Sequence, residues 1–240
     1  MKIATAFYLA IVMSLCATTA RALRGGETMD SIQDAIEEKC GKHTSISYRI
    51  ESVTAYKDSK TVMTGVYDAA LVDGKWKRRT ETKILNGLTT GPDGQPLNRS
   101  TIMLDDGVDY YNYENGAGAE FATKQGTLGK DECKSVEEVL GDLRAGNDVE
   151  FLPDEKIDGQ PVYVLSIISK NKALKQRASV SKETGVVLRL EMVIGGTFEM
   201  TTTVTVKDFK LDAPIAPERF VFTPPNGIVV RDITPKIKSK

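Results

Sequence analysis

FVFTPPNGIVVRDIT, residues 220–234, consists of two apolar runs separated by the sequence PPNG. Phe220 and Phe222 alternate with a valine, and in a strand this spacing places both aromatic rings on the same face. Proline and Asn-Gly are typical of tight turns. The stretch therefore predicts a late strand with Phe220 and Phe222 pointing inward, then a turn and another strand. Taken alone, it could also be a plain hairpin without functional meaning.

The residues upstream of this stretch show the same two-residue period. Runs of alternating apolar and polar residues at 161–168, 177–181, 186–194 and 198–207 are separated by turn signals. Successive strands with one apolar and one polar face indicate a large antiparallel sheet, which must cover its apolar face. The residues expected on that face are Leu165, Ile167, Leu188, Leu190, Met192, Phe198 and Met200.

The first half of the chain continues the pattern. Tyr48 and Ile50 share the apolar face of an expected strand, and Asp73-Gly74 is a strong signal for a two-residue hairpin turn. Glycine and alanine are frequent between residues 114 and 129, which we expect to form a mobile loop. The strands expected in this half cover residues 46–50, 61–72, 76–84, 101–104 and 108–113.

The strand expected at 76–84 carries an unusual inward charge. Its odd-numbered residues 77–83 are all charged, so that face is expected to contact water. Trp76 and Arg78 lie on the opposite face and are expected to point inward. Arg78 has no obvious acidic neighbour in the sequence, so backbone carbonyls or a distant carboxylate would have to satisfy it.

Two short amphipathic helices are expected over residues 29–40 and 131–143. Cys40 is the last residue of the first expected helix, and Cys133 lies near the start of the second. The third cysteine, Cys16, lies in the N-terminal signal peptide described below and would be removed with it. The two cysteines that remain in the exported protein predict a disulfide, which would tie the two helices together. Two short helices cover a large sheet only in part, so the sheet either curls on itself or leaves a cavity.

The N-terminus predicts export. Lys2 precedes an apolar run at residues 3–17, and Ala20-Arg21-Ala22 fits a signal-peptidase site. We therefore expect a signal peptide at residues 1–22 and a single domain at residues 23–240, although an uncleaved signal could also serve as a membrane anchor. The formal net charge of −1 argues against nucleic-acid binding.

Catalytic and metal-binding motifs are not evident. His43 is the single histidine, and with two distant cysteines it does not make a zinc site. No nucleophile-elbow pattern accompanies it. The sequence therefore predicts a protein that is not an enzyme and that needs no metal and no cofactor.

In its order of elements, the chain resembles the LolA-like superfamily of periplasmic lipoprotein carriers and related lipid-binding proteins. The resemblance rests on DGQPVYVLSI (158–167), ASVSKETGVVLRLEM (178–192), VKDFKLDAPIAPERFVFTPPNG (206–227) and DDGVDYYNY (105–113). It implies an α+β, mainly β fold, in which a large curved antiparallel sheet forms an incomplete barrel and short helices cover its mouth.

The resemblance also implies a function. Relatives hold acyl chains of lipoproteins, or lipids, in the barrel cavity, and Arg78 matches an inward arginine that helps to control lid closure. Trp76 would line the same cavity, together with Tyr48, Ile50 and the seven residues of the later strands. Those apolar residues could instead pack a dry core.

The expected function is therefore that of a monomeric periplasmic carrier or chaperone that binds lipid or lipoprotein acyl chains, with envelope membrane proteins as possible partners. A non-catalytic envelope sensor that binds a protein partner through its sheet surface is the alternative. A secreted or membrane-anchored location is the alternative to the periplasm.

Overall fold

The structure is a computed structural model. The expected signal peptide, both expected helices, Cys40, Cys133 and Phe198 lie outside the residues that it describes. Within the described part of the chain, no helix has the length and hydropathy needed to cross a membrane. The described residues are 43–85, 98–116, 119–126, 147–184, 186–195, 199–225 and 227–234.

The described residues belong to two compact units, which we treat separately. The first sheet unit lies within Thr44–Glu132 and Val206–Lys240, and the second lies within Cys133–Thr205. Strand β11 (Met200–Leu211) contributes its first half to the second sheet unit and its second half to the first.

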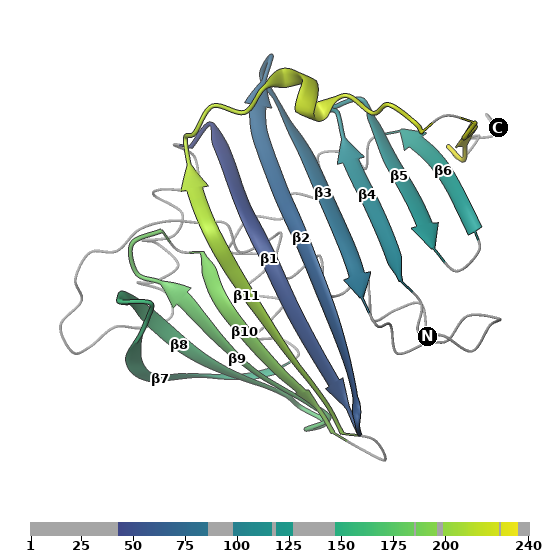
Figure 1. Ribbon diagram of the computed structural model, residues 1–240. Coiled ribbons are helices and arrows are strands. Elements are labelled where there is room, and N and C mark those ends of the chain that lie inside the picture. Colours follow the sequence, from purple (N-terminus) through teal and green to yellow (C-terminus); the bar gives the residue numbers. More distant parts are fainter. Residues whose placement is uncertain are drawn as a thin grey trace, which may run out of the picture. The chain divides into compact units, whose positions relative to one another are not determined.

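Strands β1 to β6 of the first sheet unit lie side by side in chain order, and β11 lies beside β1 (Figure 1). Its strand order is β12-β6-β5-β4-β3-β2-β1-β11, and all the paired registers are antiparallel except that of β12 with β6. Its other strands are β1 (Ser45–Tyr56), β2 (Ser59–Val72), β3 (Lys75–Leu85), β4 (Arg99–Asp105), β5 (Asp109–Gly116), β6 (Ala119–Gly126) and β12 (Val230–Asp232).

The second sheet unit is an antiparallel meander with the order β11-β10-β9-β8-β7. Its register shifts between Leu152 and Glu155, and again between Val187 and Arg189. The strands are β7 (Asn147–Ile157), β8 (Gln160–Ser169), β9 (Leu174–Ser181) and β10 (Val187–Ile194).

Two of the hairpins have the backbone conformation that their turn residues favour. Asp73 and Gly74 both have positive φ angles, of 53° and 74°, and Asp158 and Gly159 have φ angles of 49° and 83°. Two successive positive φ angles are the requirement of a type I′ turn, whose twist matches that of the flanking strands. The hairpin expected at Asp73-Gly74 is therefore confirmed.

The expectation for residues 220–234 is wrong for the first strand and confirmed for the second, which is β12 (Val230–Asp232). Pro217–Phe220 is a short 3-10 helix, η2, and the strand that follows, β12, pairs in parallel with β6. The residues around Phe220 are therefore not a strand, and β12 does not form a hairpin with them. Alternation of apolar residues reports which side chains are apolar, but it does not establish that a neighbouring strand is available for pairing. Phe220 is nevertheless buried, with 1% of its surface exposed.

The mobile loop expected between residues 114 and 129 is also wrong over most of the described part. Residues 119–126 form β6, which pairs with β5 along its whole length. Ala122 lies opposite Tyr113 and is fully buried. A small residue opposite a tyrosine leaves room for the ring and lets the two strands pack closely. The glycine and alanine content that suggested a loop is therefore compatible with a packed strand.

The first sheet unit has two distinct faces. One face, which we call the tyrosine face, contains Tyr48 and Tyr67, which lie opposite each other on β1 and β2. The other, the strap face, contains Asp68 and Leu104 and is covered in part by η2 and the residues that follow it. Phe222 stacks on Tyr111 of this face, with ring centroids 4.9 Å apart. The C-terminal segment thus supplies part of the strap-face core.

Candidate ligand-binding face

The apolar face of the second sheet unit consists of three rows of side chains that cross β8 to β11. Directly paired residues of neighbouring strands point to the same face, so the strand registers define the rows. We call this surface the three-row face. Its first row is Leu165, Ala178, Leu190 and Val204; its second is Ile167, Gln176, Met192 and Thr202; its third is Leu174, Ile194 and Met200.

The registers bring together most of the residues that the sequence placed on the apolar face of these strands. Leu165, Ile167, Leu190, Met192 and Met200 all belong to the three rows. Ile167, Leu190 and Met192 are buried, whereas Leu165 and Met200 are half-buried. Alternation within each strand was sufficient to identify them because the side-chain period of a strand is two.

Leu188 behaves differently. It lies at the register shift in β10, where Val187 pairs with Val180 and Arg189 pairs with Ser179, so Leu188 has no paired position in the rows. Its side chain is nevertheless buried. A β-bulge of this kind re-aims side chains, and strand alternation cannot reveal it in advance.

Sequence reasoning missed two buried polar residues in the second row. Gln176 and Thr202 flank Met192 and are 7% and 2% exposed. The Nε2 group of Gln176 donates a hydrogen bond to the sulfur of Met192 at 3.5 Å. A signal for Gln176 was present, because it alternates with Lys175 and Arg177 and therefore shares the face of Leu174 and Ala178.

The tyrosine face of the first sheet unit holds the other residues expected to bind ligand. Tyr48 and Ile50 are 2% and 4% exposed. The Tyr48 ring stacks on Tyr67 with centroids 4.8 Å apart, and Phe209 of β11 lies 6.1 Å from Tyr48. Edge-to-face and offset-stacked rings at such distances stabilise a rigid aromatic cluster.

Trp76 and Arg78 lie on the same tyrosine face, both half-buried. The Arg78 guanidinium lies 3.7 Å from the Asp105 carboxylate of β4, its direct neighbour across the strands. Asp105 also accepts a hydrogen bond from the backbone N–H of Gly107 at 2.9 Å. The sequence left backbone carbonyls or a distant carboxylate as partners for Arg78. The structure shows a carboxylate, that of Asp105.

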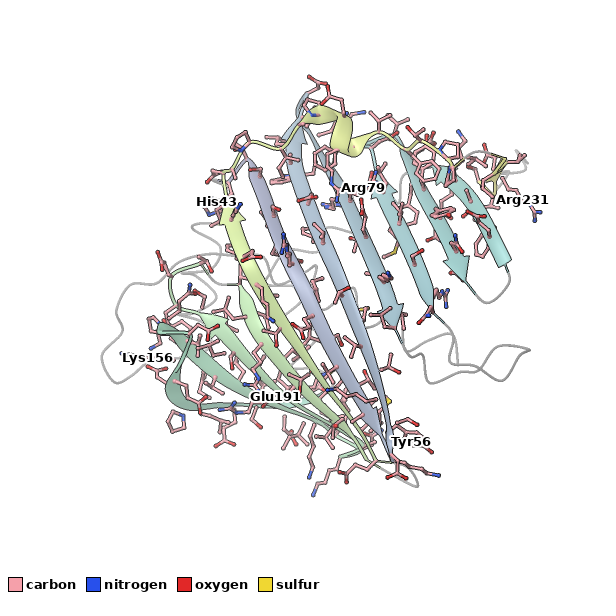
Figure 2. All side chains as sticks on the ribbon, viewed as in Figure 1. His43, Tyr56, Arg79, Lys156, Glu191 and Arg231 are labelled. Carbon is pink, nitrogen blue, oxygen red and sulfur yellow. The ribbon has the colours of Figure 1, made fainter. Side chains whose placement is uncertain are left out.

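The strap face carries a cluster of four charged side chains, which we call the clasp: Asp68, Arg79, Glu81 and Arg219. Arg219 donates hydrogen bonds to both carboxylates, and Arg79 Nε donates to Glu81 at 2.6 Å. Arg79 also lies 3.4 Å from the Arg219 carbonyl, and Figure 2 shows Arg79 on β3 beside the C-terminal segment. The face of β3 expected to be wet is thus covered at Arg79, whose side chain is 14% exposed.

Ionisation of the clasp responds to both burial and pairing. Burial of Glu81 acts to raise the pKa of its carboxyl, but the hydrogen bonds from Arg79 and Arg219 outweigh burial and lower the pKa. Burial of Arg219 acts to lower the pKa of its guanidinium, and the bonds to Asp68 and Glu81 raise it overall. Glu81 and Arg219 are therefore charged near neutral pH, and their ion pair helps to hold the C-terminal segment on the strap face.

The chemistry available on the three-row face is that of an uncharged binding surface. None of its eleven row positions carries an ionisable side chain. Within the described residues, no group of three histidine, cysteine, aspartate or glutamate side chains is placed to hold a metal ion. The arrangement offers apolar contact over four strands with one carboxamide near its centre.

Comparison with known proteins gives matches among solved structures alone, since no family model and no curated protein matches this chain. A LolA superfamily protein from Nitrosomonas europaea is 13% identical, with a TM-score of 0.32, over 82% of this chain and 99% of that one. A putative outer membrane lipoprotein-sorting protein domain from Vibrio parahaemolyticus is 12% identical, with a TM-score of 0.30, over 74% and 89%.

A chain of the Pseudomonas aeruginosa MucA/MucB complex is 13% identical, with a TM-score of 0.38, over 74% of this chain and 56% of that one. These neighbours include the LolA-like group that the sequence resembles. At such identities and TM-scores, the likeness assigns neither a ligand nor a partner to this chain.

Proposed function

We propose that this chain is an exported, non-catalytic protein of LolA-like type that binds a hydrophobic ligand, either a lipid or the acyl chains of a lipoprotein, on the three-row face. The observation that carries the proposal is the composition of that face: apolar side chains from four adjacent strands, without an ionisable group in the rows. The signal-like N-terminus supports the same reading, since a periplasmic carrier must be exported.

The energetics of such a site favour acyl chains. Each methylene group removed from water contributes about 0.8 kcal/mol, so a chain of ordinary length binds without any charged contact. An ion or a phosphate would need a counter-charge, and none of the row positions carries an ionisable side chain. A ligand whose buried part is hydrocarbon therefore matches the face best.

A small-to-large substitution separates a ligand-binding face from a dry core. Ala178 lies between Leu165 and Leu190 in the first row. If ligand occupies the space over this row, Ala178→Phe should leave the protein folded, and the phenyl ring should take the place of part of the bound chain. The affinity for a fluorescent fatty acid, measured by displacement, should then fall by roughly 10-fold. Thr201→Phe, at an exposed position of β11, is the matched control.

Two results would contradict the proposal. In a closely packed core, Ala178→Phe would destabilise the protein by about 1–3 kcal/mol, because overpacking forces side chains out of their preferred rotamers.

Native mass spectrometry of protein purified from cells should show co-purifying lipid or acylated peptide. A ligand-free mass together with no uptake of fatty acid would favour the alternative, a sensor that binds a protein through its sheet surface.

A further inference from the structure

The carboxamide of Gln176 is buried and, among the described residues, uses little of its hydrogen-bonding capacity. Gln176 is 7% exposed, and its row neighbours are Ile167 and Met192. Its Nε2 group donates to the Met192 sulfur at 3.5 Å, and a thioether is a weak acceptor. Within the described residues, no donor reaches its Oε1 atom, although an amide oxygen can accept two hydrogen bonds.

A buried amide with an unpaired oxygen destabilises the folded protein when no ligand is bound. Buried polar groups are nearly always paired, and an unpaired one indicates a functional contact or an unseen partner. A leucine would fill the same position without that cost. Gln176 lies in the middle row, between two rows that consist only of apolar side chains.

The free atoms of Gln176 define the chemistry of that partner. The carboxamide offers one N–H donor and one acceptor oxygen, and no ionisable side chain stands in the rows around it. A complementary group must therefore be uncharged and must both donate and accept a hydrogen bond. Amides and hydroxyls satisfy this condition, whereas esters lack the donor and carboxylates and phosphates carry an uncompensated charge.

We propose that Gln176 contacts the ligand directly and selects acyl chains that end in an uncharged amide or hydroxyl group. This inference rests on the proposed function and specifies its ligand. Two kinds of molecule present this chemistry, an N-acyl amide and an acylglycerol with a free hydroxyl. In either case, the hydrocarbon would cover the apolar rows, and the polar group would pair with the carboxamide.

Competition binding with matched probes tests the proposal. Oleamide, monoolein and methyl oleate share one hydrocarbon chain and differ in whether the head group donates. Wild-type protein should bind oleamide, monoolein or both roughly 10-fold more tightly than methyl oleate, because the ester leaves the Gln176 oxygen unpaired. Which of the two donor probes is preferred distinguishes an amide ligand from a glycerol ligand.

Gln176→Leu is the decisive variant. It should bind methyl oleate at least as well as wild type and should lose the roughly 10-fold preference for the donor probes. Gln160→Leu, the same substitution at an exposed position of β8, should keep the preference. Thermal unfolding of Gln176→Leu without ligand should be unchanged or shifted upward, since a strong hydrogen bond is not lost.

Each contrary outcome has a separate meaning. Equal binding of the three probes by wild type, or an unchanged preference in Gln176→Leu, would overturn the role of Gln176 while leaving the three-row face as a lipid site. Marked destabilisation of Gln176→Leu would show that the amide serves the fold and would also overturn the inference. Failure of wild type to bind any of the probes would overturn both proposals.

Discussion

The Nε atom of Arg219 lies 2.7 Å from the Asp68 carboxylate, although 151 positions separate the two residues. Asp68 is held on its other oxygen by the Ser47 hydroxyl, at 2.7 Å. The Asp68 side chain is 10% exposed, so the pair is largely removed from water. The closing stretch of the chain is therefore fastened to the first sheet unit by charge, close to the point where Phe220 is buried.

Arg219→Ala should destabilise the protein by about 2 kcal/mol, because it leaves the buried Asp68 carboxylate without its cation. Denaturant unfolding measures the loss. Arg49→Ala is the matched control: Arg49 lies 3.4 Å from Asp208, but both side chains are mostly exposed, and the expected loss is below about 0.5 kcal/mol. Equal losses of unfolding free energy in the two variants would show that the clasp does not stabilise the attachment of the C-terminal segment.

Phe220→Ala should cost about 3–4 kcal/mol, because removing a fully buried aromatic side chain loses its transfer free energy and leaves a cavity. The neighbouring Val221→Ala should cost less than about 0.5 kcal/mol, since Val221 is 59% exposed. Thermal or denaturant unfolding compares the two. A small effect at Phe220 would mean that the C-terminal segment contributes little to the stability of the sheet.

Acid should weaken the clasp. The pKa of Glu81 is lowered from its ordinary value of 4.5, so its contribution to stability is present above pH 4.5 and is lost as the pH falls through the folded-state pKa. Glu81→Gln removes this titration, and its free energy of unfolding should fall less steeply below pH 4.5 than that of wild type. Glu150→Gln, at an exposed position of β7, controls for the loss of one carboxylate. Parallel curves for wild type and Glu81→Gln would contradict the expectation.

Arg78→Leu tests whether the inward arginine controls ligand release. Its pair with Asp105 is partly exposed, so the fold should persist with a loss of under about 1 kcal/mol. If Arg78 holds a bound ligand in place, the release rate of a bound fluorescent fatty acid should rise several-fold in Arg78→Leu. Arg189→Leu, in an exposed pair with Glu191, should leave release unchanged. An unchanged rate in Arg78→Leu would reject the latch.

The positions of strands and the composition of their faces were largely predictable. Strands β2, β3, β8 and β10 lie within a few residues of the expected ranges, because alternation of apolar and polar residues is a local property of the chain. The same alternation correctly placed Met192 with Leu190 and Trp76 with Arg78. It did not reveal the register shift at Leu188, and it failed at Phe220, where a short helix replaces the expected strand.

What the sequence by itself determined is the antiparallel sheet and the list of apolar side chains that share its faces. The tertiary structure alone decided that Asp105 partners Arg78, that the clasp fastens the closing stretch, and that Gln176 stands between two apolar rows. These facts depend on the register between neighbouring strands and on where the C-terminal segment lies. Register fixes which residues become neighbours, and a shift of one position moves every side chain to the opposite face.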